Sequence, residues 1–144
     1  MKILIMGLPG SGKTWLAERL QKRLECAWFN ADEVRRMASD WEFGDDARLR
    51  QARRMRDLAN FEKGKGRIVI CDFVCPTDLT RHIFEADYTV WMDTITKGRF
   101  EDTNKMFERP FGTGVDYIVT QWFNDTDERL ADAVARHVRM KHDV

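Results

Sequence analysis

Eight consecutive residues near the amino terminus carry the clearest chemical signal in this chain. They read Gly7-Leu8-Pro9-Gly10-Ser11-Gly12-Lys13-Thr14. This is the phosphate-binding loop pattern, in which glycines let backbone N–H groups turn inward and approach phosphate oxygens closely. Lys13 can reach the β- and γ-phosphates, and the Thr14 hydroxyl can complete the coordination of a bridging Mg²⁺ ion. We therefore expect residues 7–14 to bind ATP together with Mg²⁺.

The surroundings of this loop have the pattern that such a site requires. The apolar residues 3–6 precede it and predict a buried strand. Leu16, Leu20 and Leu24 follow it at intervals of four, which is typical of one apolar helix face. The positive amino-terminal end of that helix would point at bound phosphates.

Aspartates follow three of the predicted strands, at Asp32, Asp72 and Asp93. In parallel sheets the carboxyl ends of the strands are where ligands bind, so these carboxylates are candidates for chemistry. Asp72 ends the apolar segment 67–72 and is expected to hold Mg²⁺ with Thr14. Asp32 is expected to be catalytic, orienting an acceptor hydroxyl while Lys13 holds the phosphates. A role as helix N-cap stays open for Asp32 and Asp72, because aspartate begins helices well.

Length and composition restrict the class of protein. With 144 residues, 43% of them hydrophobic, the chain is predicted to form a single domain over residues 1–144. Its 24 basic and 24 acidic residues balance, so the chain lacks the overall positive charge that is typical of a nucleic-acid-binding protein. No apolar stretch has the length of a secretory signal or a membrane span, and we expect no membrane partner.

The cysteines and histidines do not predict a metal centre. Cys26, Cys71 and Cys75 contain no C-x-x-C pair, which favours reduced thiols in a cytoplasmic protein. The histidines are scattered along the chain and lack the spacing of metal ligands.

Strand and helix patterns alternate along the chain. This alternation predicts an α/β protein with the three-layer P-loop kinase fold, a mostly parallel sheet of roughly five strands flanked by helices. The helix formers of residues 45–62 predict a long helix, and an apolar stripe after Asp125 predicts a carboxyl-terminal one. The predicted strands are residues 2–6, 26–29, 67–72, 88–92 and 116–119.

The segment 97–114 lacks a clear period and mixes basic with aromatic side chains. We expect it to form a mobile lid over the site. Its cations are the candidates for contacting phosphate from above, namely Lys97, Arg99, Lys105 and Arg109.

Four further stretches resemble the adenylyl-sulfate (APS) kinase family. The family has Asp-Gly-Asp and then Val-Arg or Ile-Arg after its second strand, where this chain has residues 30–35. It then has a Phe, an Arg five residues later and Asn-x-Arg-Arg, matched by Phe43, Arg48 and residues 51–54. Phe-Ile-Ser-Pro-Tyr followed by Arg is similar to residues 73–77 and Arg81, and Val-Asp-Thr to residues 92–94. The resemblance spans nearly the whole chain, in the correct order.

This resemblance implies an ATP-dependent phosphotransferase, a kinase of sulfate assimilation that phosphorylates the 3′-hydroxyl of APS or a similar nucleotide. It implies that Arg35 and Arg48 hold the sulfate-phosphate group, since guanidinium groups pair bidentately with such oxygens. It implies that Phe43 stacks on the adenine, as aromatic faces do with any base. It also implies a homodimer, and further substrate contacts from Asp32, Gln51, Val74 and Cys75.

The chain departs from the family pattern at several positions. Asn30 replaces the first acid, Gln51 replaces an asparagine, Cys75 replaces a serine, and Asp72 stands where the family has a small residue. The lid is also much shorter. These changes leave open another acceptor, namely a nucleoside, a nucleotide, a polynucleotide 5′-hydroxyl or a small alcohol, and nucleic acid binds only under this alternative.

A non-catalytic nucleotide-binding switch is the least favoured hypothesis. Guanine-nucleotide switches need an Asn-Lys-x-Asp base reader, whereas Asn104 and Lys105 are followed by Met106 and Phe107.

Overall fold

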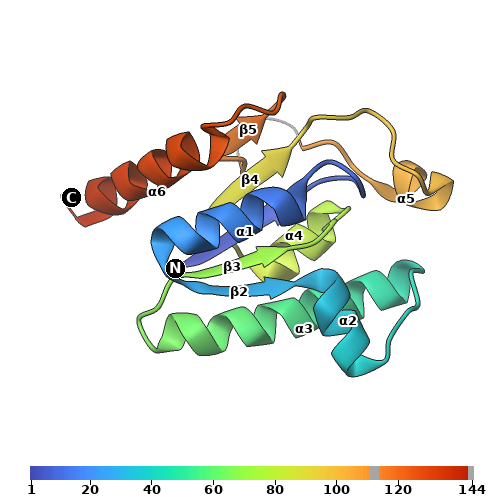
Figure 1. Cartoon of the computed structure of the whole chain (residues 1–144). Helices are drawn as coiled ribbons and strands as arrows, with labels where there is room; N and C mark the ends of the chain where they lie inside the picture. The colour runs from blue at the N-terminus through green and yellow to red at the C-terminus, as the bar shows by residue number, and fades with distance from the viewer. Residues whose placement is uncertain (111–113, 143–144) are drawn as a thin grey trace.

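The computed structural model describes residues 1–110 and 114–142. Its strands form one sheet in the order β2-β3-β1-β4-β5, and every neighbouring pair is parallel (Figure 1). The predicted three-layer α/β fold is therefore confirmed. The strands are β1 (Lys2–Met6), β2 (Ala27–Asn30), β3 (Val69–Asp72), β4 (Tyr88–Met92) and β5 (Tyr117–Val119).

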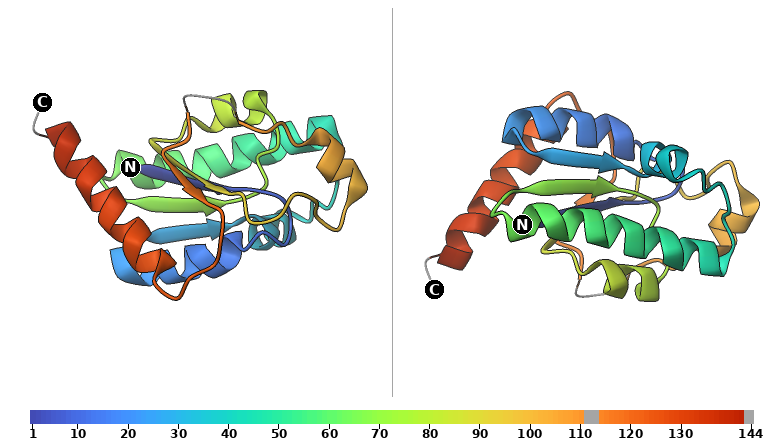
Figure 2. Two further views of the ribbon diagram at one scale, coloured as in Figure 1. Left: turned by 90° about the horizontal axis from the view of Figure 1, so that it is seen from above. Right: turned by 90° about the horizontal axis from the view of Figure 1, so that it is seen from below.

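Helices cover both faces of this sheet, as parallel strands require. One face carries α1 and α6, and the other carries α3 and α4 (Figure 2). Two of the short helices, α2 and α5, lie toward the end of the molecule where the strands finish (Figure 1). The helices are α1 (Lys13–Leu24), α2 (Ala31–Ala38), α3 (Asp45–Gly64), α4 (Asp78–Phe84), α5 (Glu101–Met106) and α6 (Thr126–His142).

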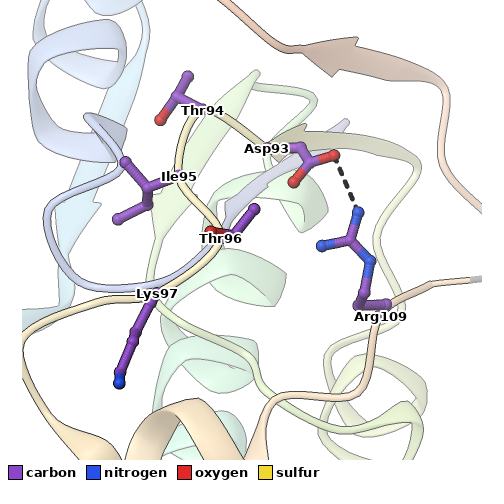
Figure 3. Close-up of a pocket in the computed structure, with 6 residues that line it drawn as sticks. All are labelled: Asp93, Thr94, Ile95, Thr96, Lys97 and Arg109. Atoms are coloured by element: carbon purple, nitrogen blue, oxygen red, sulfur yellow. Dashed lines mark hydrogen bonds and ion pairs between the residues drawn. The ribbon is translucent and has the colours of Figure 1, made fainter.

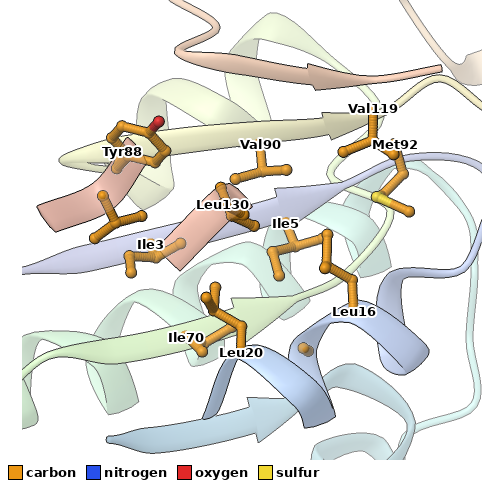
Figure 4. Close-up of a cluster of buried hydrophobic side chains, with 12 residues drawn as sticks. Ile3, Ile5, Leu16, Leu20, Ile70, Tyr88, Val90, Met92, Val119 and Leu130 are labelled. Carbon is orange, nitrogen blue, oxygen red and sulfur yellow. The ribbon is translucent and has the colours of Figure 1, made fainter. Parts of the chain in front are cut away.

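Alternate residues of each strand supply one of two hydrophobic cores. Ile3 and Ile5 of β1 pack with Leu16 and Leu20 of α1 and with Leu130 of α6 (Figure 4). The remaining β1 positions pack on the other face, against α3 and α4. Burial on both faces holds the strand ends in fixed places.

Several predicted boundaries needed correction. The second strand begins one residue later than predicted and includes Asn30, because Asn30 pairs with Asp72 of β3. The third begins at Val69, since the backbone N–H of Arg67 still bonds to Glu62 in the turn after α3. The long helix continues to Gly64 and turns at Gly66, whose φ of 74° is left-handed.

The segment predicted to be a lid contains a helix, α5, that its sequence pattern did not indicate. Residues 111–113 of this segment lie outside the described residues. Within the described ranges, the helices are all too short or too polar to cross a membrane.

Leu20→Ala should destabilise the protein by about 2–5 kcal/mol, because Leu20 is fully buried against the sheet and its removal leaves a cavity. Urea unfolding followed by circular dichroism measures this change. Leu79→Ala removes the same atoms from a side chain that is 55% exposed, and should cost less than about 0.5 kcal/mol. Equal losses for both variants would contradict the described core.

Candidate active site

The phosphate-binding loop joins β1 to α1 and requires glycine at two positions. A Cβ on Gly7 would lie 2.8 Å from the Met92 carbonyl oxygen and 2.8 Å from Ser11 Oγ. Gly12 has a φ of 101°, and its Cβ would fall within 1.4 Å of the Trp122 ring. Both glycines therefore serve the close packing of the loop as well as its curvature.

The loop keeps polar groups that the protein itself does not fully satisfy. Lys13 Nζ donates to the Leu8 carbonyl oxygen at 3.0 Å, which uses one of its three donors. Ser11 Oγ is buried and has no hydrogen-bond partner among the described residues. Burial lowers the pKa of Lys13 to about 8, against the opposing charges of Asp72 and Asp32. Oxygens of a bound phosphate could accept hydrogen bonds from Lys13 Nζ and Ser11 Oγ.

Asp72 lies beside Thr14, as the sequence predicts. Thr14 Oγ1 donates to Asp72 Oδ2 at 3.1 Å, Trp28 Nε1 donates to Oδ1 at 2.6 Å, and Asn30 Nδ2 lies 3.1 Å from Oδ2. Burial raises the pKa of Asp72 to about 6, although these hydrogen bonds and Lys13 oppose the rise. The alternative role as an N-cap is wrong for Asp72, because α4 begins later and is capped by Thr77.

Asp32 lies exposed in the first turn of α2. The helix is capped by Asn30, whose side chain accepts from the Glu33 N–H at 3.1 Å, so Asp32 is not the N-cap. Its negative charge raises the pKa of Lys13, which places it within electrostatic range of the phosphate-binding loop. The carboxylate is thus free for another role.

Arg35 and Arg48 form a cationic pair around one aromatic ring. Their guanidinium carbons lie 4.5 and 5.1 Å from the centre of the Phe43 ring. The buried Arg35 donates to the carbonyls of Asp40 and Glu42, and Arg48 donates to Thr103 Oγ1 at 2.8 Å.

Neither Arg35 nor Arg48 forms a salt bridge within the described part of the chain. Burial and the charge of Arg35 lower the pKa of Arg48 to about 10. The charge of Arg48 in turn lowers the pKa of Lys13. The charges of Asp40 and Asp32 act on Arg35 from a distance. Within the described residues, however, neither of these partly desolvated cations has a carboxylate in direct contact, and such an arrangement favours an anion.

The other expected substrate contacts differ in burial, and two of them are as buried as Arg35. Gln51 is buried, donates to the Ala31 carbonyl and accepts from Arg54. Cys75 is fully buried in a left-handed conformation, and burial raises the pKa of its thiol to about 12. Val74 is half-buried. The structure therefore brings Arg35, Phe43 and Arg48 together but leaves the Gln51 and Cys75 side chains in the interior.

The segment 98–106, which includes α5, connects the phosphate-binding loop to the cationic pair. Thr103 accepts from Arg48, and Asn104 makes a pair of hydrogen bonds with the Gly98 backbone at 2.8 and 3.1 Å. Gly98 lies against the phosphate-binding loop, since a Cβ there would be 3.0 Å from the Pro9 carbonyl oxygen. This segment thus touches both the loop and the cationic pair.

A cavity of about 490 Å³ opens beside the end of β4, between residues 93–97 and Arg109 (Figure 3). Across it, Arg109 forms an ion pair with Asp93 at 3.1 Å (Figure 3). The Arg109 guanidinium also lies over the Trp91 ring. Lys97 pairs with Glu101 at 3.6 Å. Lys97 and Arg109 are thus paired with carboxylates, in contrast to Arg48. The cavity is lined by Asp93, Thr94, Ile95, Thr96, Lys97 and Arg109.

Sequence reasoning missed three residues that contact the site, namely Trp28, Asn30 and Thr103. A signal existed for the first two, because residues 28 and 30 lie two positions apart and share one face of a strand. No pattern indicated Thr103, since its role depends on the docking of α5.

Comparison with known proteins agrees with this architecture. The AAA domain family matches residues 3–94 of the chain. A probable adenylyl-sulfate kinase of Aeropyrum pernix is 30% identical over 113 residues, which cover 69% of this chain and 60% of that protein. This chain therefore spans about 60% of the length of its curated relative.

Solved structures are similar in fold. The APS kinase of Mycobacterium tuberculosis in complex with AMPPNP and APS has a TM-score of 0.75 at 18% identity, over 96% of both chains. A sugar kinase of Janibacter has a TM-score of 0.70 at 15% identity, over 96% of this chain and 94% of its own. Shikimate kinase of Aquifex aeolicus has a TM-score of 0.64 at 15% identity, over 99% and 98%.

These likenesses confirm the P-loop kinase fold and support the resemblance to APS kinases. The matched family region contains the phosphate-binding loop, the three aspartates that follow the strands and the cationic pair. The chain belongs to the AAA domain family.

Proposed function

We propose that this protein is an ATP-dependent kinase that phosphorylates the 3′-hydroxyl of APS or a closely similar nucleotide. The observation that carries the proposal is that Arg35 and Arg48 lie around Phe43 without an ion-pair partner among the described residues, and that Arg48 lies within electrostatic range of Lys13. A sulfate-phosphate group would supply the missing negative charge. The likeness to the probable adenylyl-sulfate kinase of A. pernix points to the same acceptor.

The donor side of the reaction would use the loop of residues 7–14. Its inward backbone N–H groups and the start of α1 stabilise phosphate charge, and Lys13 adds a positive charge on the transferred group. Catalysis of phosphoryl transfer depends mainly on such positioning and electrostatic stabilisation. Lys13 is the residue most directly involved.

The residues present also fit a Mg²⁺ ion. Thr14 and Asp72 supply a hydroxyl and a carboxylate at the loop, which are the oxygen ligands that Mg²⁺ prefers. Within the described residues there is no cluster of three or more acidic, histidine or cysteine side chains, and Mg²⁺ beside ATP needs none, because phosphates and water complete its shell. When bound, the ion would neutralise charge on the phosphate oxygens.

Asp32 would orient the acceptor hydroxyl. Its carboxylate is exposed, is not used as a helix cap and lies within electrostatic range of Lys13. It can therefore accept the hydroxyl proton while the loop holds the phosphates.

The surroundings of the reaction are also part of the proposal. The resemblance implies a homodimer and a place in sulfate assimilation. All three cysteines are free thiols, which is compatible with a reducing cytoplasm.

The second candidate is a kinase of another hydroxyl, on a nucleoside, nucleotide, polynucleotide end or small alcohol. A sugar kinase and a shikimate kinase have a similar fold, so the fold alone does not choose between acceptors and leaves this candidate in place. The short α5 helix, six residues long, would leave room for a different acceptor.

Arg48→Ala should lower kcat/KM for APS roughly 10- to 150-fold, the effect of losing a charged hydrogen bond of about 1.5–3 kcal/mol. The dissociation constant of ATP, measured by calorimetry, should change by less than about twofold, because Arg48 serves the acceptor. Arg36→Ala on the neighbouring helix removes an exposed arginine paired with Glu33 and should affect neither quantity. Equal loss of ATP and APS binding in Arg48→Ala would contradict the assigned role.

ATP binding should take up a fraction of a proton near pH 8.5. In the free protein Lys13 has a pKa of about 8, so much of it is neutral there, and the bound phosphates favour the charged form. ATP affinity should therefore fall as pH rises above 8. Calorimetry in two buffers of different ionisation enthalpy measures the uptake. Lys13→Arg stays charged and should abolish it; an unchanged uptake in that variant would refute the assignment.

A further inference from the structure

The Asp72 carboxylate is held by neutral donors from three residues of two elements, β2 and α1. Trp28 of β2 donates to Oδ1 at 2.6 Å, and Thr14 of α1 donates to Oδ2 at 3.1 Å. Asn30 Nδ2 lies 3.3 and 3.1 Å from the two oxygens. We call Trp28 and Asn30 the Asp72 clamp.

Strand register explains why these groups meet. In the pairing of β2 with β3, Trp28 lies opposite Ile70 and Asn30 lies opposite Asp72. Residues two apart on a strand share a face, and Trp28 and Ile70 both belong to the core beneath α1. The four side chains therefore project toward the helix that carries Thr14.

The hydrogen bonds also fix which way each group points. Asn30 Oδ1 accepts from the Glu33 N–H in the first turn of α2, so its NH₂ group must face Asp72. The same NH₂ lies 3.1 Å from Thr14 Oγ1. Thr14 thus gives its hydrogen to Asp72 and accepts from Asn30, which leaves one lone pair on its oxygen. Thr14 is exposed, so a cation can reach that lone pair.

We propose that Trp28 and Asn30 are positioning residues for the divalent cation of this kinase, because they hold Asp72 and thereby the Thr14 hydroxyl in a ligating orientation. The inference rests on the proposed function. The clamp keeps a single negative charge at the joined ends of β2 and β3, since Asn30 contributes donors where a second carboxylate would repel Asp72.

The test measures how strongly Mg²⁺ tightens ATP binding, as the ratio of dissociation constants in EDTA and in excess Mg²⁺. Trp28→Phe should reduce this ratio by about 10- to 100-fold, the usual effect of removing a partner of a metal ligand. ATP affinity in EDTA should stay within about twofold, because the phosphate-binding loop is unchanged. Trp41→Phe changes a tryptophan that is 55% exposed and should leave the ratio intact.

A charge exchange between the strands keeps the test independent of packing around Trp28. Asn30→Asp alone places two carboxylates together, and Asp72→Asn alone removes the charge, so each should weaken the Mg²⁺ effect. The double variant restores one carboxylate with the hydrogen bond reversed, and aspartate also caps helices well. It should recover the ratio to within about tenfold of the original protein, so the losses of the two single variants should not add in the double variant.

Two results would overturn the inference. One is a Trp28→Phe protein whose Mg²⁺ effect equals that of the original, and the other is a double variant whose losses simply add. Either result leaves the proposed kinase function standing, provided the unmodified protein binds ATP more tightly with Mg²⁺. An unmodified protein that does not bind ATP would overturn both.

Discussion

The parallel pairing of β1 between β3 and β4 is the constraint on which the whole site depends. Ile5 pairs with Asp72 on one side and Met6 pairs with Trp91 on the other, so the phosphate-binding loop leaves the sheet between Asp72 and Asp93. Both faces of β1 are buried, which makes a slip in register costly. A site assembled from several elements is thus held by the core beneath it.

The two ends of the site carry opposite charge. The carboxylate of Asp72 is surrounded by neutral donors and lies beside Thr14, which suits a cation bridging phosphates. Arg35 and Arg48 lie around Phe43 without a carboxylate partner in the described ranges, which suits an anionic acceptor. Buried charges are costly when unpaired, so a ligand that neutralises the cationic pair gains affinity from this arrangement.

The phosphate-binding loop, the five strands and the contact of Thr14 with Asp72 could be predicted from the sequence, because each rests on local pattern and strand order. The sequence places Trp28 on the same strand face as Asn30, but it does not predict the hydrogen bond from Trp28 to Asp72. That bond joins residues 44 positions apart along the chain and depends on the register of two strands, which local patterns do not reveal. Helix α5 is too short for propensity to indicate it, and its position comes from contacts of Thr103 and Asn104. Burial of Gln51 and Cys75 likewise follows from packing rather than from motif.

The identity of the acceptor is the central claim, and ADP release with ATP and Mg²⁺ tests it most directly. The acceptors to compare are none, APS, a set of nucleosides and nucleotides, small alcohols such as shikimate, and 5′-hydroxyl oligonucleotides. We expect rapid ADP release with APS, with the new phosphate on its 3′-hydroxyl, and little release with the other acceptors. Turnover with another acceptor but not with APS would contradict it and assign the cationic pair to a different anion.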